Sequence, residues 1–262
     1  MMERFAGMAA DVHGEGNDTC PLVLVHGLSF DRTMWRPAVE ELMVIDPRRR
    51  IIAFDLPGHG ESSAQASCDV ASVVASLHRA VEEAEVESPV VVGHSIGAVI
   101  VTAYAVQHPA RGVVNVDQPL FTAPFAQLLQ SLAPQLRGPE FPEVWQMLEA
   151  SFHTELLPPA AQEIVRTTSR PRQDLVLGYW QEVIEQPVES LNDRVERGLT
   201  QLREKRLPYV VVAGDALDPA YAEWLDKMLP EARVVVLANS GHFPHLAHPA
   251  AFAEILADTA SW

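Results

Sequence analysis

A serine set between two glycines is the first feature of this sequence that indicates chemistry. The residues Gly93-His94-Ser95-Ile96-Gly97 interrupt a run of apolar residues, with Val90–Val92 before them and Ala98–Val101 after them. They fit the pattern G-x-S-x-G, in which a very tight turn between a strand and a helix projects a serine hydroxyl away from the backbone. Glycine on both sides lets the chain turn that sharply. The pattern predicts Ser95 as a nucleophile.

A serine hydroxyl needs a base to remove its proton, and one of the 10 histidines must supply it. His242 lies in "NSGHFPHLAHP", directly after Gly241 and just beyond the last strand-like run. A loop there reaches the carboxyl edge of a parallel sheet, where Ser95 is also expected, so we predict that His242 is the general base. We interpret His245 and His248 as helix-entry or surface residues. The three histidines could in principle hold a metal ion, but no carboxylate or cysteine pattern supports such a site.

The third member of such a set is a carboxylate that orients the imidazole and stabilises its cation. Three aspartates follow strand-like runs: Asp215 and Asp218 after "PYVVVAG", and Asp117 after "GVVNV". Our order of preference is Asp218, then Asp117, then Asp215. The choice stays open, because each of them also fits a turn or a helix N-cap, and Asp218 directly before Pro219 fits an N-cap well.

The elements that must position these residues alternate along most of the chain. Strand-like apolar runs cover residues 21–27, 50–55, 89–94, 112–117, 208–214 and 232–238, and helical spacing occurs over 34–44, 70–85, 98–107, 220–228 and 250–259. Unbroken Val, Ile and Leu are typical of strands covered on both faces. The alternation predicts an α/β fold: a mostly parallel wound sheet flanked by helices, with an antiparallel hairpin from residues 4–16 at its edge.

Residues 119–206 break this alternation. The segment contains no good strand pattern, and its prolines separate short amphipathic stretches. We interpret it as a helical cap inserted into a core domain that residues 1–118 and 207–262 form. Its aromatic residues Phe121, Trp145 and Tyr179 are predicted to bind substrate.

Composition excludes several classes of function. The 262 residues carry a formal net charge of −16, which argues against nucleic acid and anionic membranes as partners. No apolar run approaches the roughly 20 residues of a membrane span, and the first residues do not look like a secretory signal. We therefore expect a cytoplasmic protein whose partner is a small-molecule substrate. The sequence leaves the oligomeric state open.

Four segments together resemble the α/β-hydrolase superfamily, and the resemblance covers nearly the whole chain except the cap. "HGLSFDRTMW" is similar to the loop after the family's third strand, "DLPGHGESS" to its D-x-P-G-x-G-x-S turn, "GHSIG" to its nucleophile elbow, and "SGHFPHLAHPAAF" to its histidine loop. The order of serine, acid and histidine agrees as well. The acid is a departure: relatives place it three residues after the glycine that closes its strand, whereas Asp218 comes four residues after Gly214.

The resemblance implies a serine hydrolase that needs no metal and no organic cofactor. Backbone N–H groups of Leu28 and Ile96 would form the oxyanion hole, and Ser29 and Phe30 would lie at the substrate pocket. We expect cleavage of an ester or lactone of a small to medium apolar substrate through an acyl-enzyme. The alternatives are a C–C bond hydrolase of ring-cleavage products, a cofactor-free perhydrolase, and a small-ligand receptor, which would lack the nucleophile or the base.

Overall fold

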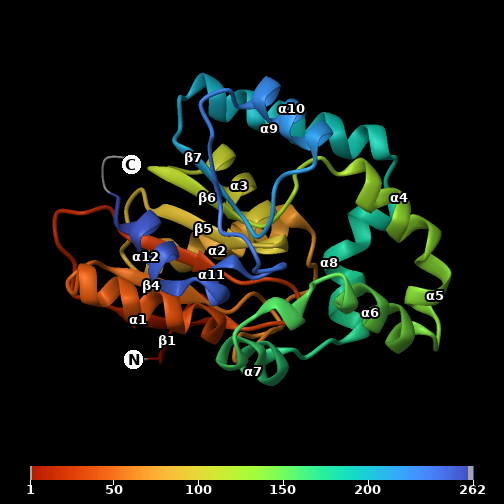
Figure 1. The fold of residues 1–262 in the computed structure, drawn as a ribbon, viewed down its shortest axis with the longest axis horizontal. Coiled ribbons are helices and arrows are strands. Elements are labelled where there is room, and N and C mark those ends of the chain that lie inside the picture. The colour runs from red at the N-terminus through yellow and green to blue at the C-terminus, as the bar shows by residue number, and fades with distance from the viewer. Residues whose placement is uncertain (1, 259–261) are drawn as a thin grey trace.

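The computed structural model describes residues 2–258 and 262, and within them eight strands form one sheet (Figure 1). The strands are β1 (Met2–Phe5), β2 (Met8–His13), β3 (Leu22–Val25), β4 (Ile51–Phe54), β5 (Val90–His94), β6 (Gly112–Val116), β7 (Tyr209–Ala213) and β8 (Arg233–Val236). Their order in the sheet is β1-β2-β4-β3-β5-β6-β7-β8. β2 runs antiparallel to β1 and β4, and the neighbours from β4 to β8 are parallel. The carboxyl ends of β3 to β8 therefore share one edge.

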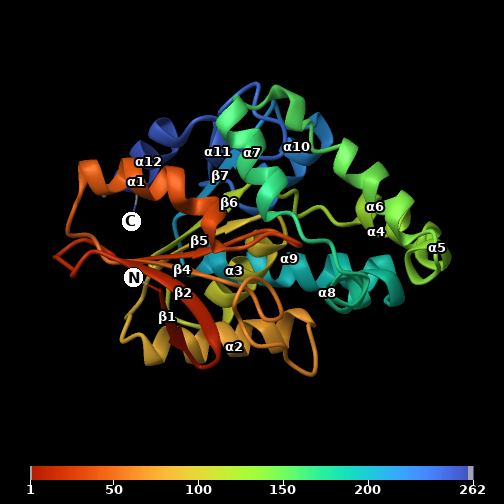
Figure 2. The same ribbon diagram turned by 90° about the horizontal axis from the view of Figure 1, so that it is seen from below.

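The two faces of the sheet carry separate apolar cores. In β5, Val91 packs into one core, whereas Val90 and Val92 pack into the other. Helices α2 and α3 cover the first face, and α1 and α12 cover the second (Figure 2). These helices span Val70–Glu83, Ile96–Gln107, Arg36–Ile45 and Pro249–Ala257, respectively. Because both faces are covered, the central strands consist mostly of apolar residues.

The predicted fold class is confirmed. All six strand-like runs form strands, and the predicted edge hairpin is the antiparallel pair β1–β2. The helical pattern expected over residues 250–259 forms α12, which ends at Ala257, and Thr259 lies outside the described residues.

The segment between β6 and β7 is helical throughout, with no strand in it. It contains α4 (Ala123–Ser131), α5 (Ala133–Arg137), α6 (Phe141–Ala150), the 3-10 turn η2 (Thr154–Leu156), α7 (Pro159–Thr168), α8 (Gln173–Glu185) and α9 (Val188–Glu204). We call this segment the helical insertion. Its last helix, α9, contacts both α4 and the sheet-covering helix α3, and Leu199 and Leu202 of α9 belong to the core under α3. α9 thus joins the helical insertion to the sheet.

Three short or peripheral helices complete the architecture: η1 (Arg32–Trp35), α10 (Pro219–Met228) and α11 (Pro244–Ala247). Within the described residues, no helix has the length and apolar character that crossing a membrane would require.

Candidate active site

The predicted nucleophile occupies a strained turn between β5 and α3. Ser95 has φ 53° and ψ −127°, a backbone conformation that residues other than glycine rarely adopt. The turn is possible because its neighbours are glycines: a Cβ on Gly93 would lie 2.2 Å from the carbonyl oxygen of Gly97, and a Cβ on Gly97 would lie 2.4 Å from the carbonyl oxygen of Val25. The two glycines therefore let the helix start directly behind the serine.

His242 and Asp117 form a hydrogen-bonded pair beside this turn. His242 Nδ1 lies 2.8 Å from Asp117 Oδ2, and the other carboxylate oxygen accepts the N–H of Gly214 at 2.8 Å. Asp117 directly follows Val116, the last residue of β6, and the N–H of Ser95 donates to the carbonyl oxygen of Val116 at 3.1 Å. The ends of β5 and β6 thus bring serine and aspartate to one place. When a carboxylate accepts the Nδ1 proton of a neutral imidazole, Nε2 is left with a lone pair, as a general base requires.

The structure does not pair His242 with Asp218, our preferred acid. Asp218 Oδ1 accepts the N–H groups of Ala220 and Tyr221 at 2.9 and 3.1 Å, so it is the N-cap of α10. Asp215 is exposed and accepts the N–H of Ala216. The hydrogen bonds therefore favour Asp117, the second of the three candidates, over Asp218 as the partner of His242.

The loop that carries Asp117 is held by a buried polar side chain of β6. Asn115 Nδ2 donates to the carbonyl oxygen of Gln118 at 2.8 Å, and Asn115 Oδ1 accepts the N–H of Gln118 at 3.1 Å. These two bonds fasten the chain on both sides of Asp117, whose φ is 52°. The asparagine is visible in the sequence as a polar residue inside a valine strand, but that signal does not say what it holds.

His94 links the serine turn to the histidine loop. Its Nε2–H donates to the carbonyl oxygen of His242 at 2.7 Å, and the two rings lie 4.7 Å apart between centroids. The side chain is fully buried, and this burial holds the pKa of His94 well below its usual value. His94 is therefore neutral, and its hydrogen bond fastens the backbone of His242 to the residue that precedes Ser95.

The loop expected to form the oxyanion hole lies against Ser95. A Cβ on Gly27 would lie 3.2 Å from Cβ of Ser95, so the chain passes the serine closely there. Ser29, with φ 68°, donates its N–H to His59 Nε2 at 3.1 Å, and His26 Nε2 accepts the N–H of Leu56 at 2.9 Å. These bonds fix the shape of the segment that contains Leu28.

Burial keeps both supporting histidines neutral. It lowers the pKa of His26 to about 4 and that of His59 to about 3. Each can therefore accept a backbone N–H at neutral pH. Ile96, the other expected oxyanion donor, is the first residue of α3, and N–H groups in the first turn of a helix have no partner within the helix.

The predicted substrate-binding residues fall into two groups. Phe30 lies beside the histidine loop, with its ring 5.5 Å from that of Phe243. The hydroxyl of Tyr179 donates to the carbonyl oxygen of Pro57, two residues before His59. Phe121 and Trp145 instead pack on other aromatic rings, Trp224 at 5.7 Å and Trp180 at 5.8 Å. Those contacts do not connect them to the paired aspartate and histidine, and substrate contact by any of them remains a prediction.

Phe152 is the main neighbour of the histidine that sequence reasoning did not single out. It lies in the helical insertion between α6 and η2, and its ring stacks on His242 with centroids 5.0 Å apart and planes 25° apart. Its carbonyl oxygen accepts the N–H of His242 at 2.9 Å. The sequence shows several aromatic residues in the insertion, but no pattern in it indicates which of them contacts His242.

The three histidines of the loop have separate roles, and they form no metal site. His245 is fully buried against Trp35, and His248 Nε2 donates to the carbonyl oxygen of Ala238. Within the described residues there is no group of three or more His, Cys, Asp and Glu side chains arranged to hold a metal ion.

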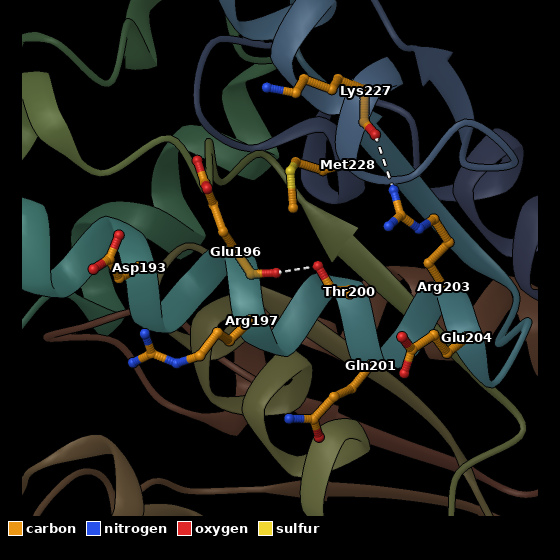
Figure 3. A pocket seen from close by; sticks show the side chains of 9 residues that line it. All are labelled: Asp193, Glu196, Arg197, Thr200, Gln201, Arg203, Glu204, Lys227 and Met228. Carbon is orange, nitrogen blue, oxygen red and sulfur yellow. Dashed lines mark hydrogen bonds between the residues drawn. The ribbon is translucent and has the colours of Figure 1, made fainter.

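An open groove lies elsewhere, between α9 and α10 (Figure 3). Most of the residues that line it are charged or polar. Among the polar contacts drawn there, Arg203 of α9 donates to the carbonyl oxygen of Lys227 of α10 at 3.3 Å, and Thr200 donates to the carbonyl oxygen of Glu196 within α9 at 2.8 Å. None of its lining residues is a predicted site residue. The groove is therefore not the site assembled around Ser95.

Comparison with known proteins decides the family. Residues 22–255 match the sequence profile of the Alpha/beta hydrolase family. The chain belongs to this family. Proteins named pimeloyl-[acyl-carrier protein] methyl ester esterase are similar to this alpha/beta hydrolase over almost its full length. The one from Yersinia enterocolitica serotype O:8 is 27% identical over 265 residues, which is 95% of this chain and 96% of the relative. The one from Salmonella typhi is 27% identical over 263 residues, which is 93% of this chain and 94% of the relative.

Solved structures agree with the alpha/beta hydrolase fold. An esterase from Thermogutta terrifontis superposes with a TM-score of 0.71 at 20% identity, covering 98% of this chain and 97% of the other. An AqdC variant described for ring-cleavage of the Pseudomonas quinolone signal superposes with a TM-score of 0.79 at 18% identity, covering 99% and 98%. At such identities the likeness shows the fold alone. Family membership and the esterase-named relatives together make this alpha/beta hydrolase a hydrolase enzyme.

Proposed function

We propose that this alpha/beta hydrolase is a carboxylester hydrolase that works through an acyl-enzyme on Ser95, with His242 as general base and Asp117 as the acid. The observation that carries the proposal is the 2.8 Å hydrogen bond between His242 and Asp117 beside the strained serine turn. A neutral histidine with Nδ1–H held by a carboxylate presents its free Nε2 as the base that a serine nucleophile needs.

The chemical steps follow from these roles. His242 Nε2 takes the hydroxyl proton as Ser95 Oγ attacks the ester carbonyl, and the new C–O bond places negative charge on the carbonyl oxygen. Backbone N–H groups of Leu28 and Ile96 would stabilise that charge. Hydrogen bonds of His26 and His59 hold the loop that carries Leu28, and Ile96 begins α3. The protonated base then returns the proton to the departing alcohol. Water, deprotonated by the same histidine, releases the acid and restores the serine.

The substrate we propose is a small-molecule ester or lactone with an apolar acyl group. The rings of Phe152 and Phe243 lie against His242, and Phe30 packs on Phe243, so the surroundings of the histidine are apolar. The relatives from Yersinia and Salmonella are named for a methyl ester, so methyl esters of small carboxylic acids are the first substrates to test.

The test combines active-site labelling with turnover. A fluorophosphonate should add one adduct to the wild-type protein, seen in its intact mass, and none to Ser95→Ala. Ser95→Ala should also lose at least about 10⁴-fold in kcat on p-nitrophenyl and methyl esters of increasing chain length, because the covalent route is removed. Ser131→Ala is the matched control, since Ser131 is exposed in the helical insertion and bonds only to Leu128 in its own helix.

Failure has a clear form. A wild-type protein that takes up no fluorophosphonate and turns over no ester would refute the proposal. Turnover confined to ring-cleavage dienones, with the ester panel silent, would instead favour a C–C bond hydrolase.

A further inference from the structure

Phe152 brings the helical insertion into direct contact with the base of the proposed reaction. Three contacts join them: the ring of Phe152 stacks on the imidazole, its carbonyl oxygen accepts the N–H of His242, and Gly241 passes against the backbone of Phe152 and His153. A Cβ on Gly241 would lie 2.4 Å from the carbonyl oxygen of Phe152, which explains why glycine precedes the histidine. These contacts make the insertion part of the wall that holds the base.

The stacked geometry also has an electrostatic meaning. The two ring planes are 25° apart with centroids 5.0 Å apart, so the imidazole faces the π surface of the phenyl ring rather than its edge. An aromatic face carries partial negative charge and attracts a cation placed over it. In the proposed reaction His242 becomes a cation when it takes the proton of Ser95, so the attraction grows as the reaction reaches its transition state.

The other groups around His242 show why this contact can matter. Asp117 is the carboxylate paired with Nδ1, and the rings of His94 and Phe243 lie 4.7 and 5.5 Å away. His94 is buried and neutral, as is His245 behind it. On the side of the insertion, the exposed His153 pairs with Glu155 at 3.0 Å. Of the three aromatic rings named here, that of Phe152 is the most nearly parallel to the imidazole, at 25°, whereas the rings of His94 and Phe243 are tilted by 49° and 68°.

We propose that Phe152 is a positioning residue of the reaction, which fixes the plane of the His242 ring and stabilises its protonated form through its π face. This inference rests on the proposed ester hydrolysis. It assigns a function to one residue of the helical insertion, and it makes catalysis depend on how the insertion is seated against the histidine loop.

The test replaces the ring and leaves the backbone contact in place. Phe152→Leu keeps the carbonyl oxygen that holds His242 but removes the π face. We expect kcat on a p-nitrophenyl ester to fall roughly 2- to 5-fold, and the acid limb of the pH profile of kcat/KM to move down by about half a pH unit. The sign follows from the charge: a less stable imidazolium protonates only at lower pH. Phe152→Tyr, which retains an aromatic face, should restore the wild-type acid limb.

Phe141→Leu is the matched control. Phe141 also belongs to the insertion and stacks on another ring, that of Trp145 at 6.1 Å and 27°, so the same change removes a similar stack from a place that does not touch the base. It should leave the acid limb unmoved, whatever it does to the melting temperature. An acid limb that stays in place in Phe152→Leu, or that moves equally in Phe141→Leu, would overturn the inference. A wild-type enzyme without esterase activity would instead refute the proposed function, so the two failures are distinguishable.

Discussion

The assignment of Asp117 as the acid can be tested by a single-atom change. In Asp117→Asn an amide replaces the carboxylate that now accepts the Nδ1 proton of His242 and the N–H of Gly214. If the amide oxygen keeps the bond to Gly214, the NH₂ group faces Nδ1, and it can bond only to a histidine whose Nδ1 carries a lone pair. That tautomer has its proton on Nε2, so it cannot accept a proton from Ser95.

The size of the effect follows from the charges. In the wild type, the protonated histidine and the carboxylate are opposite charges about 4 Å apart, and at an effective dielectric constant of about 20 they attract by about 4 kcal/mol. The side chains are only 17% and 22% exposed, so bulk water screens the pair weakly. Removing about 4 kcal/mol from the transition state corresponds to a loss of about 10³-fold in kcat, and the wrong tautomer can extend it towards 10⁴.

The assay compares two aspartates by the same substitution. Asp117→Asn and Asp218→Asn are measured on one p-nitrophenyl ester, with fluorophosphonate labelling to report on the serine separately. Asp218→Asn should keep turnover within about 2-fold and stability within about 0.5 kcal/mol, because asparagine caps a helix as well as aspartate does. Full turnover by Asp117→Asn together with loss of turnover in Asp218→Asn would show that His242 takes its charge partner from the loop after β7, and the reasoning from the hydrogen bond would be wrong.

Two further predictions concern stability. Burial lowers the pKa of His245 to about 3 from 6.5, and neither ring nitrogen has a protein partner within the described residues. Below pH 6.5 the unfolded chain therefore binds a proton at this histidine that the folded chain does not, which destabilises the fold by about 2 kcal/mol at pH 5. Between pH 7.5 and 5, the free energy of unfolding in urea should therefore fall by about 2 kcal/mol less in His245→Leu than in the wild type. An equal fall in both proteins would contradict the prediction. Arg32 pairs at 2.5 Å with the fully buried Asp55, so Arg32→Met should lower the free energy of unfolding by about 3–5 kcal/mol in urea, and a loss below about 1 kcal/mol would mean that Asp55 finds another partner.

Much of this architecture can be predicted from sequence because it depends on local patterns. Unbroken valine runs, such as the one that becomes β5, indicate strands buried on both faces, and the glycines around Ser95 indicate the tight turn. The long stretch without strand patterns indicates the helices between β6 and β7. The first two signals lie within a dozen residues each, and the third is the absence of any strand pattern over residues 119–206.

The two partners of His242, the carboxylate of Asp117 and the ring of Phe152, could not be predicted in the same way. Asp117, Asp215 and Asp218 all follow strand ends, and only the path of the loops decides that the first meets His242 while the last caps α10. Phe152 reaches the histidine across a long separation in sequence, through a turn in which His153 has φ 51°. No local pattern encodes such a meeting, because it depends on how two separate segments pack.

Four of the nine non-glycine residues with positive φ in the described part of the chain lie at or beside the site. Ser29, Ser95, Asp117 and His153 have φ values of 68°, 53°, 52° and 51°, and none of them is glycine. Such conformations typically cost about 1–3 kcal/mol per residue, which the packed cores on both faces of the sheet must offset. If the proposed function is right, these positions sacrifice stability for activity. Engineering that selects for melting temperature alone would favour glycine at Ser95 and Asp117, and in doing so it would remove the proposed nucleophile and acid.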